Sequence, residues 1–135
     1  MKFTGLDNKI YTFNFNKQTR ESTKSGLHLK AFNAIKKCFP YSSIYEDLTL
    51  YGCCLGGPPL IADFFITDFP ALIEVHGEQH YKFSKFFHKN MAQFKKYVQN
   101  DKIKQEWCAL NDVVYVELPF DKIKEWPKII GESIE

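Results

Sequence analysis

The sequence lacks an apolar run long enough to cross a membrane. No window approaches the roughly 18 consecutive apolar residues that a spanning helix needs, and the first residues, MKFTGLDNKIYTF, contain no apolar block of the signal-peptide kind. No Cys-x-x-Cys spacing is present, and a chain of 135 residues does not need disulfides to stabilise its core. We therefore expect a cytoplasmic protein with reduced thiols and no membrane partner.

Positive charge is absent from the centre of the chain, although the net charge is +2. Residues 41–80 hold six acids and no Lys or Arg, whereas residues 1–40 hold eight basic residues against two acids and residues 81–104 hold seven against one. A basic surface on either side of an acidic centre suits a polyanion held by its phosphates over a site that attracts cations. Taken alone, lysine-rich helices that serve only solubility are the commoner explanation.

The hydrophobic pattern predicts a single α/β domain over residues 1–135. Apolar residues at three- and four-residue spacing predict helices over residues 24–38 and 88–110, and a terminal helical segment over residues 121–135 that Pro127 interrupts. Aromatic and β-branched runs predict a hairpin extension within residues 1–20 and four core strands, in the segments SSIYEDLTLYG, LIADFFI, ALIEVH and VVYVELP. The order of these elements predicts a mixed central sheet flanked by helices, in a core of residues 24–120.

Two carboxylates fall inside the predicted core strands. Asp63 lies within LIADFFI and Glu74 within ALIEVH, and the short turn between these segments makes the strands antiparallel neighbours. Asp63 and Glu74 then lie at comparable distances from the turn, at the same end of the sheet. Two carboxylates in a cleft of low dielectric constant repel each other, so they are tolerated when one is protonated or when a cation lies between them.

A divalent metal ion is the simplest resident of such a site. Mg2+ and Mn2+ take oxygen ligands from carboxylates and backbone carbonyls, and the carbonyl of Val75 is a natural additional ligand. A bound metal lowers the pKa of its water and stabilises the leaving oxygen of a phosphodiester. The pair therefore predicts phosphodiester hydrolysis with Mg2+, or Mn2+, as the cofactor.

The segment ADFFI, followed by LIEVHGEQHY and then by NDKIKQEWC and NDVVYVELPF, resembles the PD-(D/E)XK nuclease superfamily. The resemblance is closest to the phage-type branch related to very-short-patch-repair endonucleases, and it covers residues 24–120. It implies a restriction-endonuclease-like core of one helix, three antiparallel strands, a helix and a further strand. The activity it implies is that of a structure-selective or nicking DNA endonuclease, acting in the host-cell cytoplasm if the protein is viral.

Carried over by position, the resemblance implies that Asp63 and Glu74 hold the metal together with the Val75 carbonyl. His76 stands where the superfamily usually has a lysine, and an imidazole there would act as a base or a phosphate contact. Gln79 and His80 match a Gln-His pair that lies over the site in similar proteins.

The resemblance also extends to both helices of the implied core. Asp101 and Lys104 match an Asp-x-x-Lys pattern on the second helix, where Lys104 would replace the missing lysine of the strand. His28 occupies the place of an active-site glutamate on the first helix, and Glu46 or Glu21 would compensate for that loss. A buried imidazole without a functional role is the alternative for His28.

Two other functions stay open beside the nuclease: binding without cleavage, and inhibition of transcription or of another host process through protein contacts. The missing strand lysine favours a nuclease-fold protein that binds nucleic acid or a host protein without cutting. DNA is the expected partner of the enzyme, and a homodimer would extend its recognition because the chain has no room for a helix-turn-helix or zinc-finger appendage. A zinc site is a minor alternative, and its candidate ligands are Cys53, Cys54, Cys108, His76 and His80.

Overall fold

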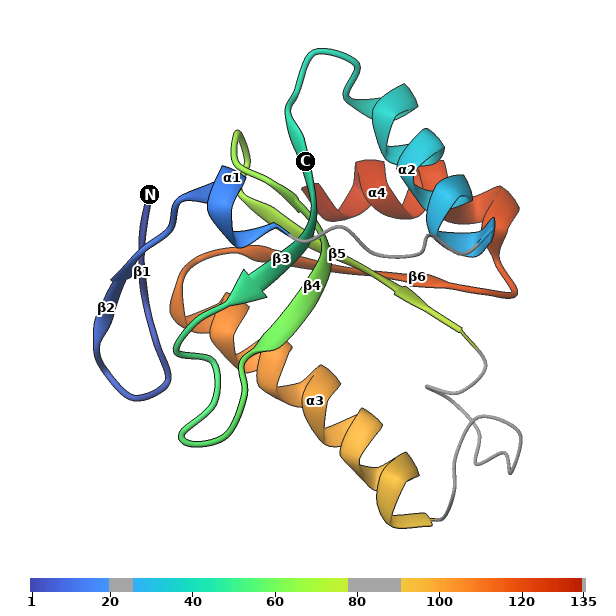
Figure 1. Ribbon diagram of the computed structural model, residues 1–135. Helices are drawn as coiled ribbons and strands as arrows, with labels where there is room; N and C mark the ends of the chain where they lie inside the picture. Colours follow the sequence, from blue (N-terminus) through green and yellow to red (C-terminus); the bar gives the residue numbers. More distant parts are fainter. Residues whose placement is uncertain (20–25, 78–90, 135) are drawn as a thin grey trace.

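The computed structural model describes residues 1–19, 26–77 and 91–134 (Figure 1). The elements are, in chain order, β1 (Lys2–Thr4), β2 (Ile10–Thr12), α1 (Phe15–Gln18), α2 (Gly26–Cys38), β3 (Ile44–Leu50), β4 (Leu60–Ile66), β5 (Ala71–His76), α3 (Met91–Leu110), β6 (Val114–Pro119), the short 3-10 helix η2 (Ile123–Glu125) and α4 (Trp126–Ile134).

Four strands form the central sheet in the order β3-β4-β5-β6. The pairs β3/β4 and β4/β5 are antiparallel, whereas β5 and β6 are parallel. Both β4 and β5 have the bounds that their apolar runs predict, because Pro59 precedes β4 and the turn at residues 67–70 separates the two strands. The predicted mixed α/β architecture with an N-terminal hairpin is therefore confirmed.

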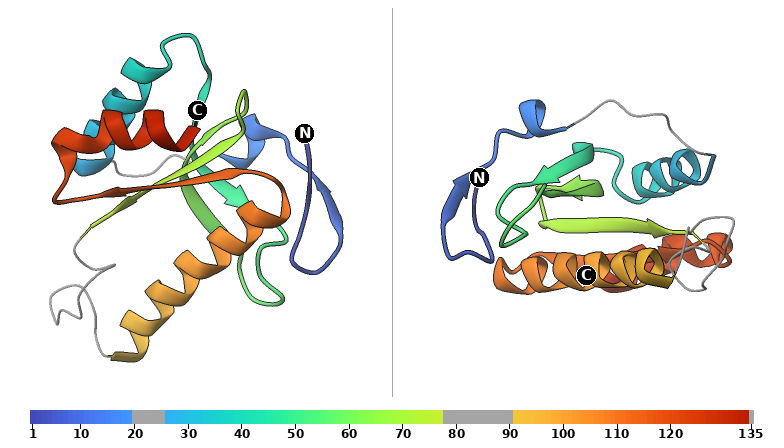
Figure 2. Two further views of the ribbon diagram at one scale, coloured as in Figure 1. Left: turned by 180° about the vertical axis from the view of Figure 1, so that it is seen from behind. Right: turned by 60° about the horizontal axis from the view of Figure 1, so that its bottom comes forward.

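Helices cover both faces of this sheet. On one face, α2 and α4 contact each other and pack on Phe64 and Ile73, with Ile35 and Ile130 as their own buried residues. Figure 1 and the left view of Figure 2 show these two helices side by side and α3 away from both. The other face, which includes Leu72, packs against α3. Among the described helices, none is long and apolar enough to span a bilayer.

The N-terminal hairpin of β1 and β2 is part of the core on the α3 face. The ring of Phe3 lies 5.0 Å from that of Trp107 on α3 and 5.8 Å from that of Phe65 on β4. At the end of α3, the side chain of Asn111 accepts from the backbone N–H of Thr4 at 2.7 Å and donates to the Thr4 carbonyl at 2.9 Å. The hairpin is thus fixed to α3 by both apolar packing and a pair of hydrogen bonds.

The C-terminal segment differs from the sequence prediction at Pro127. This proline does not interrupt a helix but occupies the second position of α4, directly after η2. A proline is tolerated in the first turn of a helix because the N–H that it lacks has no intrahelical acceptor there. The short helix α1, for which the polar stretch after β2 gave no signal, is the other difference.

Candidate functional site

The candidate site lies where β4 and β5 separate. Regular pairing between these strands ends at Phe64 and Ile73. Beyond that point, the backbone N–H of Asp63 donates to Glu74 Oε2 at 2.7 Å, and the N–H of Val75 donates to Asp63 Oδ2 at 2.9 Å. These reciprocal bonds replace the ladder and bring Asp63 and Glu74 together, as the turn geometry predicts.

Lys104 of α3 reaches the same place from the helix side. Its ammonium forms an ion pair with Glu74 Oε1, and the Glu74 residue is only 2% exposed. Burial disfavours the charged ammonium, but the charge and the hydrogen bond of Glu74 outweigh burial, and the pKa of Lys104 is raised. The site therefore contains a permanent cation on α3 rather than on the strand.

Asp63 is the acid that the surroundings disfavour as a carboxylate. Burial is the main cause, followed by the charge of Glu74, and together they raise the pKa of Asp63 to about 8 although Val75 and Lys104 act in the opposite direction. At neutral pH the carboxyl of Asp63 thus holds a proton unless another cation replaces it. A buried carboxyl group that needs either a proton or a metal ion is typical of metal sites and of catalytic acids.

His76 lies at the end of β5 in a buried network rather than in an open cleft. The residue His76 is 2% exposed, and its ring forms an ion pair through Nδ1 with Glu117 of β6. The Nε2 atom lies 3.6 Å from Asp101 Oδ1 on α3 and 3.3 Å from the hydroxyl of Tyr115. Burial opposes protonation, but the hydrogen bond to Glu117 and the charges of Asp101 and Glu117 raise the pKa of His76. The ring therefore connects β6 to α3.

On the α2 side of the site, His28 contacts one residue of β3 and one of β4. Its ring stacks on Phe64 with centroids 4.4 Å apart, and its Nε2 lies 2.9 Å from Glu46 Oε1. One ring nitrogen of His28 and one carboxylate oxygen each of Asp47 and Asp63 lie within 4.8 Å of one another. The structure thus brings His28 close to Asp63 and gives its ring a carboxylate partner in Glu46.

Asp47 is the residue of this group that the sequence analysis missed. It lies opposite Asp63 in the β3/β4 register, between the pairs Glu46–Phe64 and Leu48–Ala62, but makes no ladder pair and has a left-handed φ of 51°. The signal that could have found it is the pair of consecutive acids in the strand segment IYEDLTL. With strict alternation, only one of two adjacent acids faces a given side.

Gln79, His80 and Glu21 lie outside the described residues. Of the cysteines proposed for zinc, Cys53 and Cys54 have sulfur atoms 3.6 Å apart, and burial raises the pKa of Cys53 to about 11 and that of Cys108 to about 12. Within residues 1–19, 26–77 and 91–134, these cysteines form no metal-binding group with His76.

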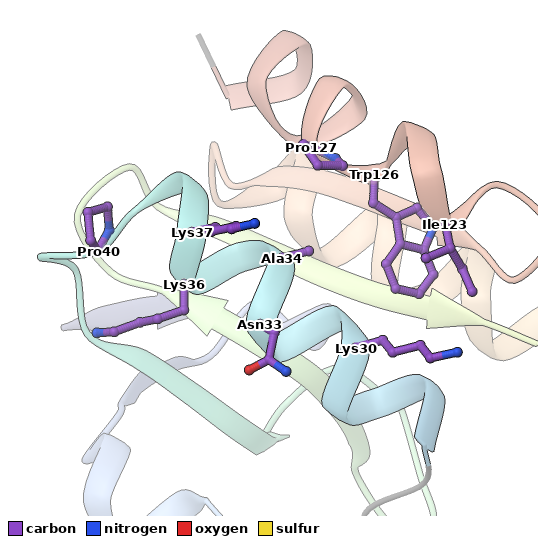
Figure 3. Close-up of a pocket in the computed structure, with 9 residues that line it drawn as sticks. All are labelled: Lys30, Asn33, Ala34, Lys36, Lys37, Pro40, Ile123, Trp126 and Pro127. Atoms are coloured by element: carbon purple, nitrogen blue, oxygen red, sulfur yellow. The ribbon is translucent and has the colours of Figure 1, made fainter.

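A separate hollow of about 650 Å³ lies between α2 and the start of α4 (Figure 3). Trp126 and Pro127 line one side and the α2 residues Lys30 and Lys37 the other. None of the sequence-predicted site residues lines it. Three of its lining residues are lysines and none is acidic, so this hollow extends the basic surface of α2.

The fold and the site define the class of this protein as a mixed α/β protein with an acidic cluster at the open end of its sheet. No family model matches the chain, and no solved structure matches it. Two viral proteins are similar to part of it. Uncharacterized protein 307L of Invertebrate iridescent virus 6 is 38% identical over 63 residues, which are 47% of this chain and 32% of that protein.

The second similar protein is uncharacterized protein 033L of Invertebrate iridescent virus 3. It is 38% identical over 48 residues, which are 36% of this chain and 25% of that protein. The chain therefore matches a third or less of the length of each viral protein. These matches show a likeness to viral proteins.

Proposed function

We propose that this protein is a metal-dependent endonuclease that hydrolyses DNA phosphodiester bonds on a restriction-endonuclease-like core. The observation that carries the proposal is the convergence of Asp63, Glu74 and Lys104 from β4, β5 and α3 at the point where the sheet opens. Two buried carboxylates favour a cation, and the lysine provides positive charge for a phosphate. These are the components that phosphodiester hydrolysis requires.

The donor set fits Mg2+ or Mn2+. Asp63 and Glu74 offer carboxylate oxygens, and the N–H of Val75 is directed at Asp63. Since the N–H and C=O of one residue in an extended strand point to the same side, the Val75 carbonyl faces the same gap. Hard cations prefer such oxygen donors. When bound, the ion would lower the pKa of a water and neutralise charge on the phosphate.

Side chains of the protein would stabilise negative charge on the phosphate and hold the site in position. Lys104 limits the repulsion between the two carboxylates and can contact a phosphate oxygen as negative charge develops. Asp101 lies three residues earlier on α3, one helical turn away, so its contact with His76 fixes the position of Lys104 over the sheet. His76 would thus act as a positioning residue.

DNA is the proposed substrate because basic residues flank the acidic site. The described lysines of α2 and the start of α4 lie on elements that border the acidic cluster or pack beside it, and they can hold phosphates through a salt-dependent contact. The substrate form we favour is a nicked, branched or otherwise distorted duplex. In an infected cell such a protein would act in the cytoplasm.

A second function, binding without cleavage, is favoured by a specific observation. Both oxygens of Glu74 already accept hydrogen bonds, one from Lys104 and one from the N–H of Asp63. A nuclease fold in which internal bonds satisfy the acids would bind nucleic acid or a host protein without hydrolysis. The absence of a lysine from β5 agrees with this alternative.

Cleavage of a panel of single-stranded, duplex, nicked and branched DNA with Mg2+ or Mn2+ tests the proposal. We expect the wild-type protein to cut at least one substrate, and Asp63→Asn and Glu74→Gln to lower the rate by about a hundredfold or more. Glu106→Gln, on the exposed side of α3, is the matched control and should keep the activity. Binding of these DNAs with no cleavage under any condition would favour the second function.

A further inference from the structure

The group of His28, Asp47 and Asp63 is used only in part by the proposed nuclease. Its members come from α2, β3 and β4, and their potential ligand atoms lie within 4.8 Å of one another. Asp47 is 8% exposed, and the side chain of His28 is 11% exposed. Three metal-ligating side chains from three elements are thus gathered in a largely buried place.

Glu46 and Phe64 hold the ring of His28 in a defined orientation. Metal-binding histidines almost always place a carboxylate, a carbonyl or a water on their second ring nitrogen, which fixes the tautomer and the direction of the ring. In this protein, Glu46 Oε1 lies 2.9 Å from His28 Nε2, and Phe64 stacks on the ring face. Glu46 lies outside the group of three and orients the imidazole toward a fixed direction.

The two aspartates lie opposite each other on antiparallel strands. Like charges at opposed positions of neighbouring strands are destabilising. Asp47 and Asp63 occupy opposed positions between two regular ladder pairs. A cation shared by both carboxyl groups would allow both to be charged at this short distance.

We propose that His28, Asp47 and Asp63 form a binding site for a divalent transition metal, Mn2+, Co2+ or Zn2+, in preference to Mg2+. An imidazole nitrogen is a borderline ligand that suits transition metals, whereas Mg2+ prefers oxygen donors and keeps its waters. The site shares Asp63 with the Asp63–Glu74 pair. It goes beyond the nuclease, because metal binding here does not require that the chain cleaves DNA.

The test is a titration of the intact protein with CoCl2, followed by visible absorption, with calorimetric titrations of MnCl2 and MgCl2 beside it. We expect wild-type protein to develop a Co2+ absorption band and to bind Mn2+ more tightly than Mg2+. His28→Ala and Asp47→Asn should each weaken Co2+ binding by about a hundredfold. Glu46→Gln, which disturbs only the orientation of the ring, should weaken it by about tenfold.

Asp112→Asn is the matched control. Asp112 is exposed and has a left-handed φ of 55°, close to the 51° of Asp47, and asparagine tolerates this conformation as aspartate does. The control should bind Co2+ like wild type. Circular dichroism of each variant establishes that it is folded, and His28→Ala serves alone if Asp47→Asn unfolds.

The outcomes separate this site from the proposed nuclease. Wild-type Co2+ affinity in folded His28→Ala and Asp47→Asn would overturn the proposal. If Glu74→Gln loses Co2+ binding while those two variants keep it, the ion belongs to the Asp63–Glu74 pair, and the nuclease stands without this site. If the two variants lose Co2+ binding and wild type cuts no DNA, the metal site stands and the nuclease fails.

Discussion

Strands β4 and β5 differ sharply between the two halves of their length. From the turn as far as Phe64 and Ile73 they form a regular ladder, and all six paired residues are fully buried. Beyond that point, the ladder gives way to bonds between side chains and backbone, centred on Asp63 and Glu74. The apolar half stabilises the sheet, whereas in the polar half the strands separate and the side chains of Asp63, Glu74 and Lys104 come together.

This contrast shows how a small sheet holds two acids at its end. Backbone groups that lose their strand partner must find another acceptor or stay unsatisfied, which costs free energy. Here the carboxylates supply these acceptors, so the same side chains satisfy the open backbone and form the site.

The largest effect is expected in the apolar half. Phe64 is fully buried against α2 and α4, so Phe64→Ala should lower the free energy of unfolding by about 4 kcal/mol. Urea unfolding followed by circular dichroism measures the change. A loss below about 1 kcal/mol would mean that this half is not the stabilising one.

A somewhat smaller loss is expected from breaking the ion pair in the polar half. Glu74→Gln leaves the ammonium of Lys104 buried without a carboxylate at hydrogen-bonding distance, which should cost about 3 kcal/mol of the free energy of unfolding. The double variant Glu74→Gln with Lys104→Met removes both charges and should recover most of that loss. If the double variant is no more stable than Glu74→Gln, the pair is not coupled.

The pH dependence of stability should reveal the acid that is disfavoured as a carboxylate. The pKa of Asp63 rises from 3.8 to about 8 on folding, so between these values the folded state binds a proton that the unfolded state has released. The free energy of unfolding therefore falls as pH rises through this window, by up to about 1.4 kcal/mol per pH unit. His76 acts in the same direction, because its raised pKa gives stability that is present below pH 6.5 and lost as pH rises.

Urea unfolding between pH 5 and pH 8 measures this slope. Asp63→Asn should flatten it, and saturating Mn2+ should do so in wild type because the ion replaces the proton. Asp112→Asn, at an exposed position, should leave the slope unchanged. Equal slopes in wild type and Asp63→Asn would contradict the assignment of the titration to Asp63.

The smallest effect concerns the backbone at Asp47. Glycine adopts a positive φ without strain, so above pH 8, where Asp63 is ionised, Asp47→Gly should stabilise the metal-free protein by about 1 kcal/mol, from relief of strain and of repulsion with Asp63. Asp112→Gly, at a φ of 55°, relieves the strain alone and should stabilise less. Thermal unfolding of both variants without metal compares them. A larger gain at Asp112 would show that the charge of Asp47 is not destabilising.

Much of the fold follows from local sequence signals. The bounds of β4 and β5 could be predicted because prolines and a short turn enclose two apolar runs, and the same turn makes Asp63 and Glu74 neighbours. Helix α2 ends at Cys38, before Pro40, for a similar local reason. These features depend on residues within a few positions of one another.

The remaining features depend on tertiary geometry. Asp47 joins the site because β3 departs from regular pairing at a single left-handed residue, which alternation does not reveal. His76 could be placed at the end of β5, but its burial beside Glu117 and Asp101 depends on how β6 and α3 approach. The prediction that Pro127 interrupts a helix is wrong because proline can begin a helix as well as end one.

The two hydrogen bonds between Asn111 and Thr4 couple the N-terminal hairpin to the remote candidate site. Asn111 directly follows α3, and Lys104 lies two turns earlier on the same helix. The position of the hairpin therefore affects the position of the Lys104 ammonium through α3. Deleting the first fourteen residues would expose Trp107 and remove the contacts that hold the C-terminal end of α3. Chemistry at the open end of the sheet would then change although no atom near the acids had been altered.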